Sequence, residues 1–332
     1  MVHRRPRTGL LPAVCWGAAL AVAWASAAAA QPARPGRLAP PEEHSLTTKD
    51  GVQLRITYYP SNAGQQAVPV VLLHDYLETR AVMEPLAAML QNPPAELADL
   101  LPPGGPVQPR AAVTVDLRGH GESKMAFDYG DVPYELDANH FRREDFQDMV
   151  LFDLETVRSF LVAENDAGRL NLNKLCLVGS GMGANLALTW AARDWAVPPL
   201  AARKQGQDVK ALVLLSPRRN FRGLSSVEPL KFPPVQQRLS IYLAYGAADL
   251  RVGRECANMT KLLERYHPDP PRDQIAERKE FFVFAPEVTL QGSKLLTSEE
   301  FGLAPKIAAF IELRLGRRDY PHSVRLHRPV TE

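Results

Sequence analysis

Six short apolar runs, separated by longer segments of helical character, constrain the fold of this chain more than any other feature. The runs cover residues 68–73, 111–115, 175–178, 211–215, 239–245 and 281–284. They are continuous rather than alternating, which is typical of strands buried on both faces. Between the second and third runs, apolar residues from Phe146 to Leu161 recur at helical spacing. We therefore predict an α/β fold, with a mostly parallel central sheet and helices on both faces.

Both ends of this region have recognisable boundaries. An Asp-Gly pair at Asp50 and Gly51 lies between two strand-like segments, 46–48 and 52–58, and this dipeptide strongly favours a hairpin. We predict an antiparallel N-terminal hairpin at the edge of the sheet. At the other end, residues 305–315 form the expected final helix. The predicted domain therefore covers residues 46–315, and a loose basic C-terminal tail follows at 316–332.

The first thirty residues resemble an export signal. Three arginines (Arg4, Arg5 and Arg7) precede an apolar run from residue 10 to 25, and Ala28 and Ala30 have the spacing of a signal-peptide cleavage site. We predict a signal peptide at 1–30, a Pro-rich linker at 31–45 and a periplasmic or secreted protein. The alternative is an uncleaved anchor, because residues 10–30 could span a bilayer. Contact with a membrane is predicted only through this leader.

Charge and cysteine content exclude several functions. Removing the three leader arginines from the 39 Lys and Arg leaves 36 against 37 Asp and Glu, so the rest of the chain is almost neutral. Without a basic stripe, binding to nucleic acid is not expected. Of three cysteines, only Cys176 and Cys256 lie beyond the leader, and we predict that both stay unpaired. Cys176 lies within an apolar run and is interpreted as a small buried hydrophobe.

Metal and nucleotide sites are not predicted. The chain has no pair of histidines at metal-ligand spacing and no C-x-x-C motif. Gly179, Gly181 and Gly183 follow a strand and precede a helix, but they lack the G-x-G-x-x-G spacing and the lysine of phosphate-binding loops. No cofactor is therefore expected. The partner is predicted to be a small molecule or a protein.

Four segments resemble the α/β-hydrolase family, and the resemblance covers nearly all of residues 46–315. They are VVLLHDYLETR, VDLRGHGES, LCLVGSGMGANLAL and YGAADLRV, in this order along the chain. The third has the strand–turn–helix form of a nucleophile elbow, built on Gly179, Ser180 and Gly183. The resemblance implies a serine-hydrolase fold with a nucleophile at position 181. It also implies an oxyanion hole from the backbone amides of Tyr76 and Met182.

The chain departs from this pattern at the positions where the chemistry takes place. Position 181 is Gly181, which has no hydroxyl group, although Ser180 precedes it. The position most similar to the family's catalytic histidine is Gln291, which cannot act as a general base. Asp249 lies where the acid of the triad is expected. Without an imidazole to orient, it is interpreted as a helix cap.

Neighbouring polar residues are interpreted as structural. Asp75 replaces the glycine that commonly follows His74 in the family, and its charge would oppose an oxyanion. His74 and His120 are expected to support their loops. Further expectations are that Asp116 pairs with Arg118, that His267 is solvated and that Ser180 bonds to local backbone. Residues 217–237, where the family often has a lid, are expected to be too short for a folded cap and to leave any pocket open.

Two functions remain open at this point. The first is an exported protein that has lost hydrolase activity and binds a ligand or partner. The second is an active esterase or acyl hydrolase with an unusual catalytic set, for example with Ser180 as nucleophile. Reaction with a fluorophosphonate probe would distinguish them.

Overall fold

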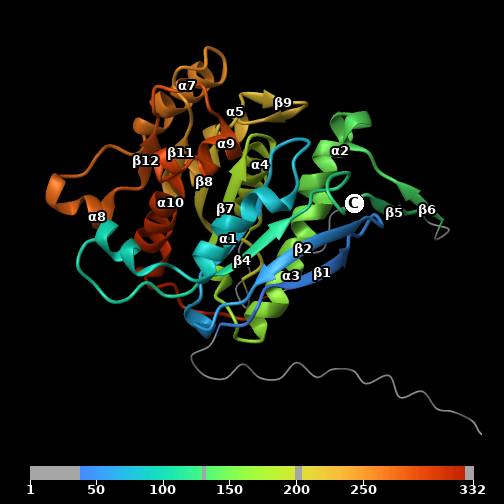
Figure 1. The fold of residues 1–332 in the computed structure, drawn as a ribbon, viewed down its shortest axis with the longest axis horizontal. Coiled ribbons are helices and arrows are strands. Elements are labelled where there is room, and N and C mark those ends of the chain that lie inside the picture. Colours follow the sequence, from blue (N-terminus) through green and yellow to red (C-terminus); the bar gives the residue numbers. More distant parts are fainter. Residues whose placement is uncertain (1–37, 129–131, 199–203, 326–332) are drawn as a thin grey trace, which may run out of the picture. The chain divides into compact units, whose positions relative to one another are not determined.

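An eight-stranded sheet forms the centre of the molecule, in a computed structural model that describes residues 38–128, 132–198 and 204–325 (Figure 1). The strand order is β1-β2-β4-β3-β7-β8-β11-β12. These strands are β1 (Glu42–Thr47), β2 (Gln53–Tyr59), β3 (Pro69–Leu73), β4 (Ala111–Val115), β7 (Leu175–Ser180), β8 (Val209–Leu215), β11 (Ser240–Ala244) and β12 (Phe281–Phe284). In Figure 1, β1 and β2 (blue) lie at one edge and β12 (orange) at the other.

The pairing of the strands confirms the predicted sheet. Strands β4, β3, β7, β8, β11 and β12 are parallel to one another, whereas β2 runs antiparallel to both β1 and β4. The hairpin turn falls at Asp50 and Gly51, as predicted, but β1 begins at Glu42, before the predicted boundary at residue 46. Two small sheets are separate from this one. They pair β5 (Met125–Phe127) with β6 (Pro133–Glu135), and β9 (Asn220–Phe221) with β10 (Leu224–Ser225).

Helices cover both faces of the sheet, which explains why the inner strands β3, β4, β7 and β11 are buried along their whole length. In β3, Val71 and Leu73 face one hydrophobic cluster, while Val70 and Leu72 face the other. The first cluster packs under α3 (Leu154–Asp166), α4 (Met182–Ala196), α5 (Val227–Lys231), α6 (Pro233–Arg238) and α7 (Val252–Glu264). The second packs under α1 (Glu84–Gln91), α9 (Gly292–Thr297) and α10 (Leu303–Ile311). The short helix α8 (Ile275–Arg278) precedes β12.

The predicted helix from Phe146 to Leu161 is present, with an irregular middle. Helix α2 (Arg143–Asp148) continues through a π-helical segment (Met149–Asp153) into α3. The five apolar residues whose spacing predicted this helix are all buried: Phe146, Val150, Leu154, Val157 and Leu161. The final helix, α10, begins at Leu303 and likewise ends in a π-helical segment, Glu312–Gly316.

The segment after the final helix is anchored, in contrast to the loose tail that the sequence suggested. Backbone carbonyls of Tyr320, Pro321 and Ser323 accept hydrogen bonds from the buried side chains of Asn171, Asn173 and Asn165, respectively. At the end of the described segment, Arg325 is 3% exposed, and its Nε lies 3.2 Å from the carboxylate of Asp208. Asp208 is also paired with Arg158 at 2.7 Å.

The lid segment 217–237 is folded, so the expectation that it is too short for a folded cap is wrong. It contains β9, β10 and α5 and most of α6, and Leu230 and Val235 reach into the core. Pro229 lies within α5 and Pro233 begins α6, so very short helices connected by extended residues provide the cover. Its turn, Arg222-Gly223, has positive φ at both residues, which matches a tight type I′ hairpin.

Other predictions concern the cysteines and the leader. Cys176 and Cys256 are both unpaired and buried, as predicted. The predicted signal peptide at 1–30, the first part of the linker and residues 326–332 lie outside the described residues. Within the described ranges, no helix is long and apolar enough to cross a membrane.

Burial on both faces of the sheet predicts a large cost for truncating a central strand. Leu72 in β3 is fully buried, so Leu72→Ala should lower the free energy of unfolding by about 2–5 kcal/mol. Leu250→Ala, at a side chain that is 83% exposed, should change it by less than about 0.5 kcal/mol. Urea denaturation of both variants measures the difference. Equal stabilities would contradict this packing.

Candidate functional site

The turn between β7 and α4 has the geometry of a nucleophile elbow. Gly181 at its apex has φ 49° and ψ −107°, a conformation that costs little for glycine and strains other residues. A Cβ atom at Gly179 would overlap the backbone of Gly183, and one at Gly183 would overlap the carbonyl oxygens of Leu73 and His74. Glycine at both positions therefore lets strand and helix approach closely.

The space above the apex is occupied by the carboxylate of Asp75. A Cβ atom at Gly181 would overlap both carboxylate oxygens of Asp75. One of these oxygens, Oδ1, accepts hydrogen bonds from the backbone amides of Tyr76 and Met182, each at 2.7 Å. These are the two amides that the resemblance assigned to an oxyanion hole. A negatively charged oxygen of the chain itself thus lies where that hole would receive one from a substrate.

The loop that carries Asp75 is connected to α9 by hydrogen bonds. The backbone amide of Asp75 donates to Glu78 Oε2 at 3.1 Å, and the amide of Glu78 donates to the Asp75 carbonyl at 3.1 Å. The other oxygen of the Glu78 carboxylate accepts a hydrogen bond from the hydroxyl of Ser293 in α9. This network fixes the loop, so the position of the Asp75 side chain is determined by more than its own two contacts.

Ser180 is buried beneath the elbow rather than exposed above it. Its side chain is fully buried, and a Cβ atom at Gly292 would lie 2.6 Å from its Oγ atom. The hydroxyl has no hydrogen-bond partner among the residues that the structure describes. The prediction that it bonds to local backbone is therefore wrong.

Gln291 and Asp249 are engaged in separate structural contacts. Gln291 Oε1 accepts hydrogen bonds from the Ser216 hydroxyl at 2.6 Å and the Gly246 amide at 3.2 Å, and its Nε2 donates to the Gly246 carbonyl at 2.8 Å. The Asp249 carboxylate accepts from the amides of Arg251 and Val252, at 2.9 and 2.7 Å, at the start of α7. This agrees with the capping role interpreted from the sequence. The Gln291 side chain thus links the loops that carry Ser216 and Gly246.

The nearby histidines support loops. The Nδ1 atom of His74 lies 2.6 Å from the Asp75 carbonyl, and its Nε2 accepts from the Leu117 amide at 3.2 Å. Burial and the neighbouring His120 lower the pKa of His74 to about 4, so the ring is neutral at ordinary pH. His120 Nδ1 lies 2.8 Å from the Arg118 carbonyl, and burial lowers its pKa as well. The supporting roles expected for both residues agree with these contacts.

Two other expectations are corrected by the structure. Asp116 does not pair with Arg118 but accepts from the backbone and guanidinium of Arg80. Arg118 pairs with Asp153 at 2.6 Å and with Asp50 at 2.7 Å. His267 is not a solvated loop residue, because its ring is half-buried and packs against Phe281 with ring centroids 6.2 Å apart.

The lid segment packs against the loop that carries Tyr76. The guanidinium of Arg222 lies over the ring of Tyr76, 4.5 Å from its centroid, and the Phe221 ring lies 5.5 Å from the same ring. Gly181 itself is buried. Among the described residues, no group of His, Cys, Asp and Glu could hold a metal ion. The sequence indicated the elbow and the unusual residue Asp75, but not that the Asp75 carboxylate lies over Gly181.

Comparison with known proteins identifies the family. Residues 70–320 match the profile of the Alpha/beta hydrolase family, and the chain belongs to this family. Similar solved structures include an esterase from Pyrococcus furiosus (14% identity, TM-score 0.52, covering 83% of this chain and 93% of that one). A dienelactone hydrolase from Anabaena variabilis is 15% identical, with a TM-score of 0.51, and the match covers 83% of this chain and 99% of that one. An esterase from Pyrobaculum calidifontis is 16% identical, with a TM-score of 0.50, and the match covers 83% of this chain and 86% of that one. At such low identities the likeness concerns the fold. No curated protein matches the sequence.

Removing the Asp75 carboxylate should destabilise the protein. Asp75→Ala leaves the amides of Tyr76 and Met182 without their charged acceptor, which should lower the free energy of unfolding by about 1–3 kcal/mol. Asp99→Ala, at an exposed residue, is the matched control and should change it by less than about 0.5 kcal/mol. Urea denaturation compares the two. An Asp75→Ala variant as stable as the control would show that the contact contributes nothing to stability.

The environment of His74 predicts loss of stability in acid. The pKa of His74 is about 4 in the folded protein and near 6.5 in an unfolded chain, so the unfolded state binds a proton first as the pH falls. Stability should therefore decrease between pH 6.5 and pH 4, by up to about 3 kcal/mol from this residue. Urea denaturation at several pH values gives the slope, and His74→Gln should make it shallower. An unchanged slope in this variant would contradict the assignment.

Proposed function

We propose that this protein is an exported, catalytically inactive member of the α/β-hydrolase family that acts by binding a ligand or partner. One observation carries the proposal: the Asp75 carboxylate lies over Gly181 and takes the hydrogen bonds of both candidate oxyanion-hole amides. Export is supported by the sequence pattern of residues 1–30.

The chemistry of ester hydrolysis explains why this arrangement argues against catalysis. The reaction needs a nucleophile, a base that takes its proton, and hydrogen-bond donors that stabilise the negative oxygen of the intermediate. Gly181 supplies no nucleophile and Gln291 supplies no base. The donors already bind an anion, and a substrate oxyanion beside Asp75 would meet like charge. Loss of a triad residue alone lowers kcat by roughly 10⁴ to 10⁶.

The alternative is an ester hydrolase that uses another catalytic set. The similar fold of the two esterases and the dienelactone hydrolase supports it at the level of architecture. It would require a nucleophile outside the elbow, because Ser180 is buried and Gly181 has no side chain.

Labelling with a fluorophosphonate, read by intact mass, tests the proposal. The wild-type protein should remain unlabelled and should not hydrolyse p-nitrophenyl acetate above the blank. Gly181→Ser alone should also remain unlabelled, because its side chain would collide with Asp75. The triple variant Asp75→Gly, Gly181→Ser, Gln291→His should gain weak labelling. The first substitution frees the space above residue 181, the second introduces a hydroxyl there, and the third introduces an imidazole that can act as a base.

The outcomes separate the two functions. A covalent adduct on the wild-type protein, located by peptide mass spectrometry, would establish the alternative and identify its nucleophile. Labelling of Gly181→Ser alone would show that Asp75 does not block the apex. The control is the double variant Asp75→Gly, Gly181→Ser, which keeps Gln291 and therefore lacks the imidazole. It should stay unlabelled.

A further inference from the structure

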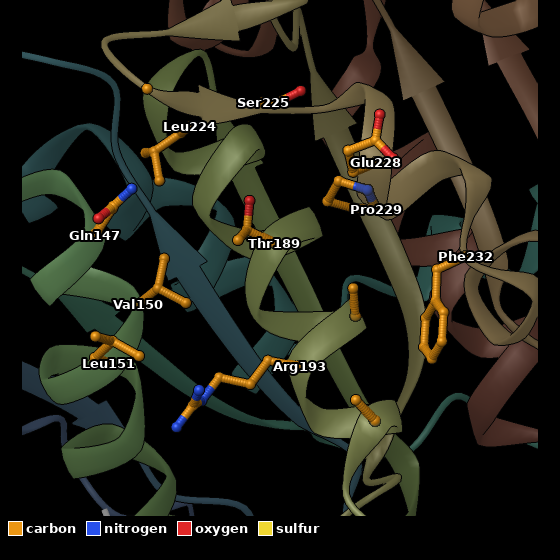
Figure 2. Close-up of a pocket in the computed structure, with 13 residues that line it drawn as sticks. Gln147, Val150, Leu151, Thr189, Arg193, Leu224, Ser225, Glu228, Pro229 and Phe232 are labelled. Atoms are coloured by element: carbon orange, nitrogen blue, oxygen red, sulfur yellow. The ribbon is translucent and has the colours of Figure 1, made fainter. Parts of the chain in front are cut away.

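A groove of about 620 Å³ lies along helix α4, away from the elbow (Figure 2). Its walls come from the π-helical segment after α2, from α4 and from the lid. Gly181, Asp75 and Gln291 are not among the residues that line it. Thr189, the lining residue of α4 nearest to the elbow in sequence, lies eight residues beyond Gly181, which is about 12 Å along a helix. The groove is therefore separate from the site discussed above.

Small side chains on α4 leave this space between larger apolar walls. Ala192 and Ala196 face the groove where a larger residue would fill it. Figure 2 shows Val150 and Leu151 on one side of α4, with Pro229 and Phe232 of the lid segment on the other. Val150 and Leu151 belong to the π-helical segment, and irregular turns of this kind are frequent at functional sites. The surface is thus apolar and built from three elements.

The charged residues of the groove already have counterions. The Nε atom of Arg193 lies 4.0 Å from the buried carboxylate of Glu155, and Glu228 lies 3.5 Å from Lys231. A charged ligand would lose hydration without finding an uncompensated partner, which is costly. Thr189 and Ser225 provide hydroxyl groups that can bond to an uncharged polar atom. The electrostatics of the groove therefore favour a neutral ligand.

The size of the groove indicates a small molecule. Ligand sites usually measure about 300–1,000 Å³, and 620 Å³ corresponds to about twenty groups the size of a water molecule. We infer that the groove binds an uncharged, apolar small molecule of the fatty-alcohol or neutral-lipid class. This inference deepens the proposed binding role and rests on it, but it assigns the ligand to α4 and the lid instead of the elbow.

Titration of the purified protein with the neutral dye Nile red tests the inference. Saturable fluorescence enhancement at one site, with a dissociation constant on the order of 10 µM, is expected. 1-Dodecanol should displace the dye at least tenfold more effectively than dodecanoate, which has the same chain with a negative charge. Neither competitor contains an ester, so the measurement does not depend on hydrolysis. Equal or better displacement by dodecanoate, or no saturable binding, would overturn the inference.

Two variants locate the site. Ala192→Phe should fill the groove and weaken Nile red binding at least tenfold, whereas Ala163→Phe, on the exposed face of α3, should bind as wild type. Circular dichroism and thermal unfolding establish that each variant is folded. If Ala192→Phe does not fold, Leu151→Glu places a charge on the opposite wall and should have the same effect, with Leu250→Glu as its control. If a folded Ala192→Phe or Leu151→Glu variant binds Nile red with wild-type affinity, the ligand does not bind in this groove.

Other occupants would give different results. A dimer in sedimentation that is lost in Ala192→Phe would assign the groove to a second copy and overturn the small-molecule inference. The fluorophosphonate experiment remains independent. If the wild-type protein neither binds Nile red nor reacts with the fluorophosphonate, the groove is rejected as a ligand site, while the proposed loss of catalysis is retained. If the wild-type protein reacts with the fluorophosphonate and also binds Nile red, only the proposed loss of catalysis is rejected.

Discussion

Two backbone N–H groups, those of Tyr76 and Met182, converge on one carboxylate oxygen of Asp75, and this contact joins the loop after β3 to the start of α4. Partly buried donors of this kind need an acceptor. In an active hydrolase the acceptor would be supplied by water or substrate. Here it is a carboxylate of the chain, on the residue directly before Tyr76. Both donors therefore bond to an acceptor of the chain itself.

Close backbone contact explains the shape of the elbow. Gly179 and Gly183 are required because strand and helix nearly touch, whatever residue stands between them. The strained apex costs less with glycine than with serine. Gln291 bonds to the Ser216 hydroxyl and to the backbone of Gly246, and so links the loops that carry these two residues.

The sequence predicted those parts of the structure that depend on local pattern. The run 111–115 coincides with β4, which is buried along its whole length, and the run 281–284 coincides with the edge strand β12, in which Val283 is exposed. The elbow was recognisable because its glycines are set by close backbone contact. Partners remote in sequence could not be predicted: Asp116 meets Arg80, and Arg118 meets Asp153 and Asp50. The lid was missed because its helices are only one or two turns long and carry prolines.

The anchored C-terminal segment has a consequence for the order in which the chain becomes stable. Asp208 is completely buried, and one of its guanidinium partners, Arg325, stands at the end of the described residues. Before that segment docks, the carboxylate lacks part of its compensation, and a buried charge of this kind is expensive. Contacts between residues this distant in sequence form slowly. Cooperative folding should therefore be completed only when residues 320–325 have docked against the rest of the domain.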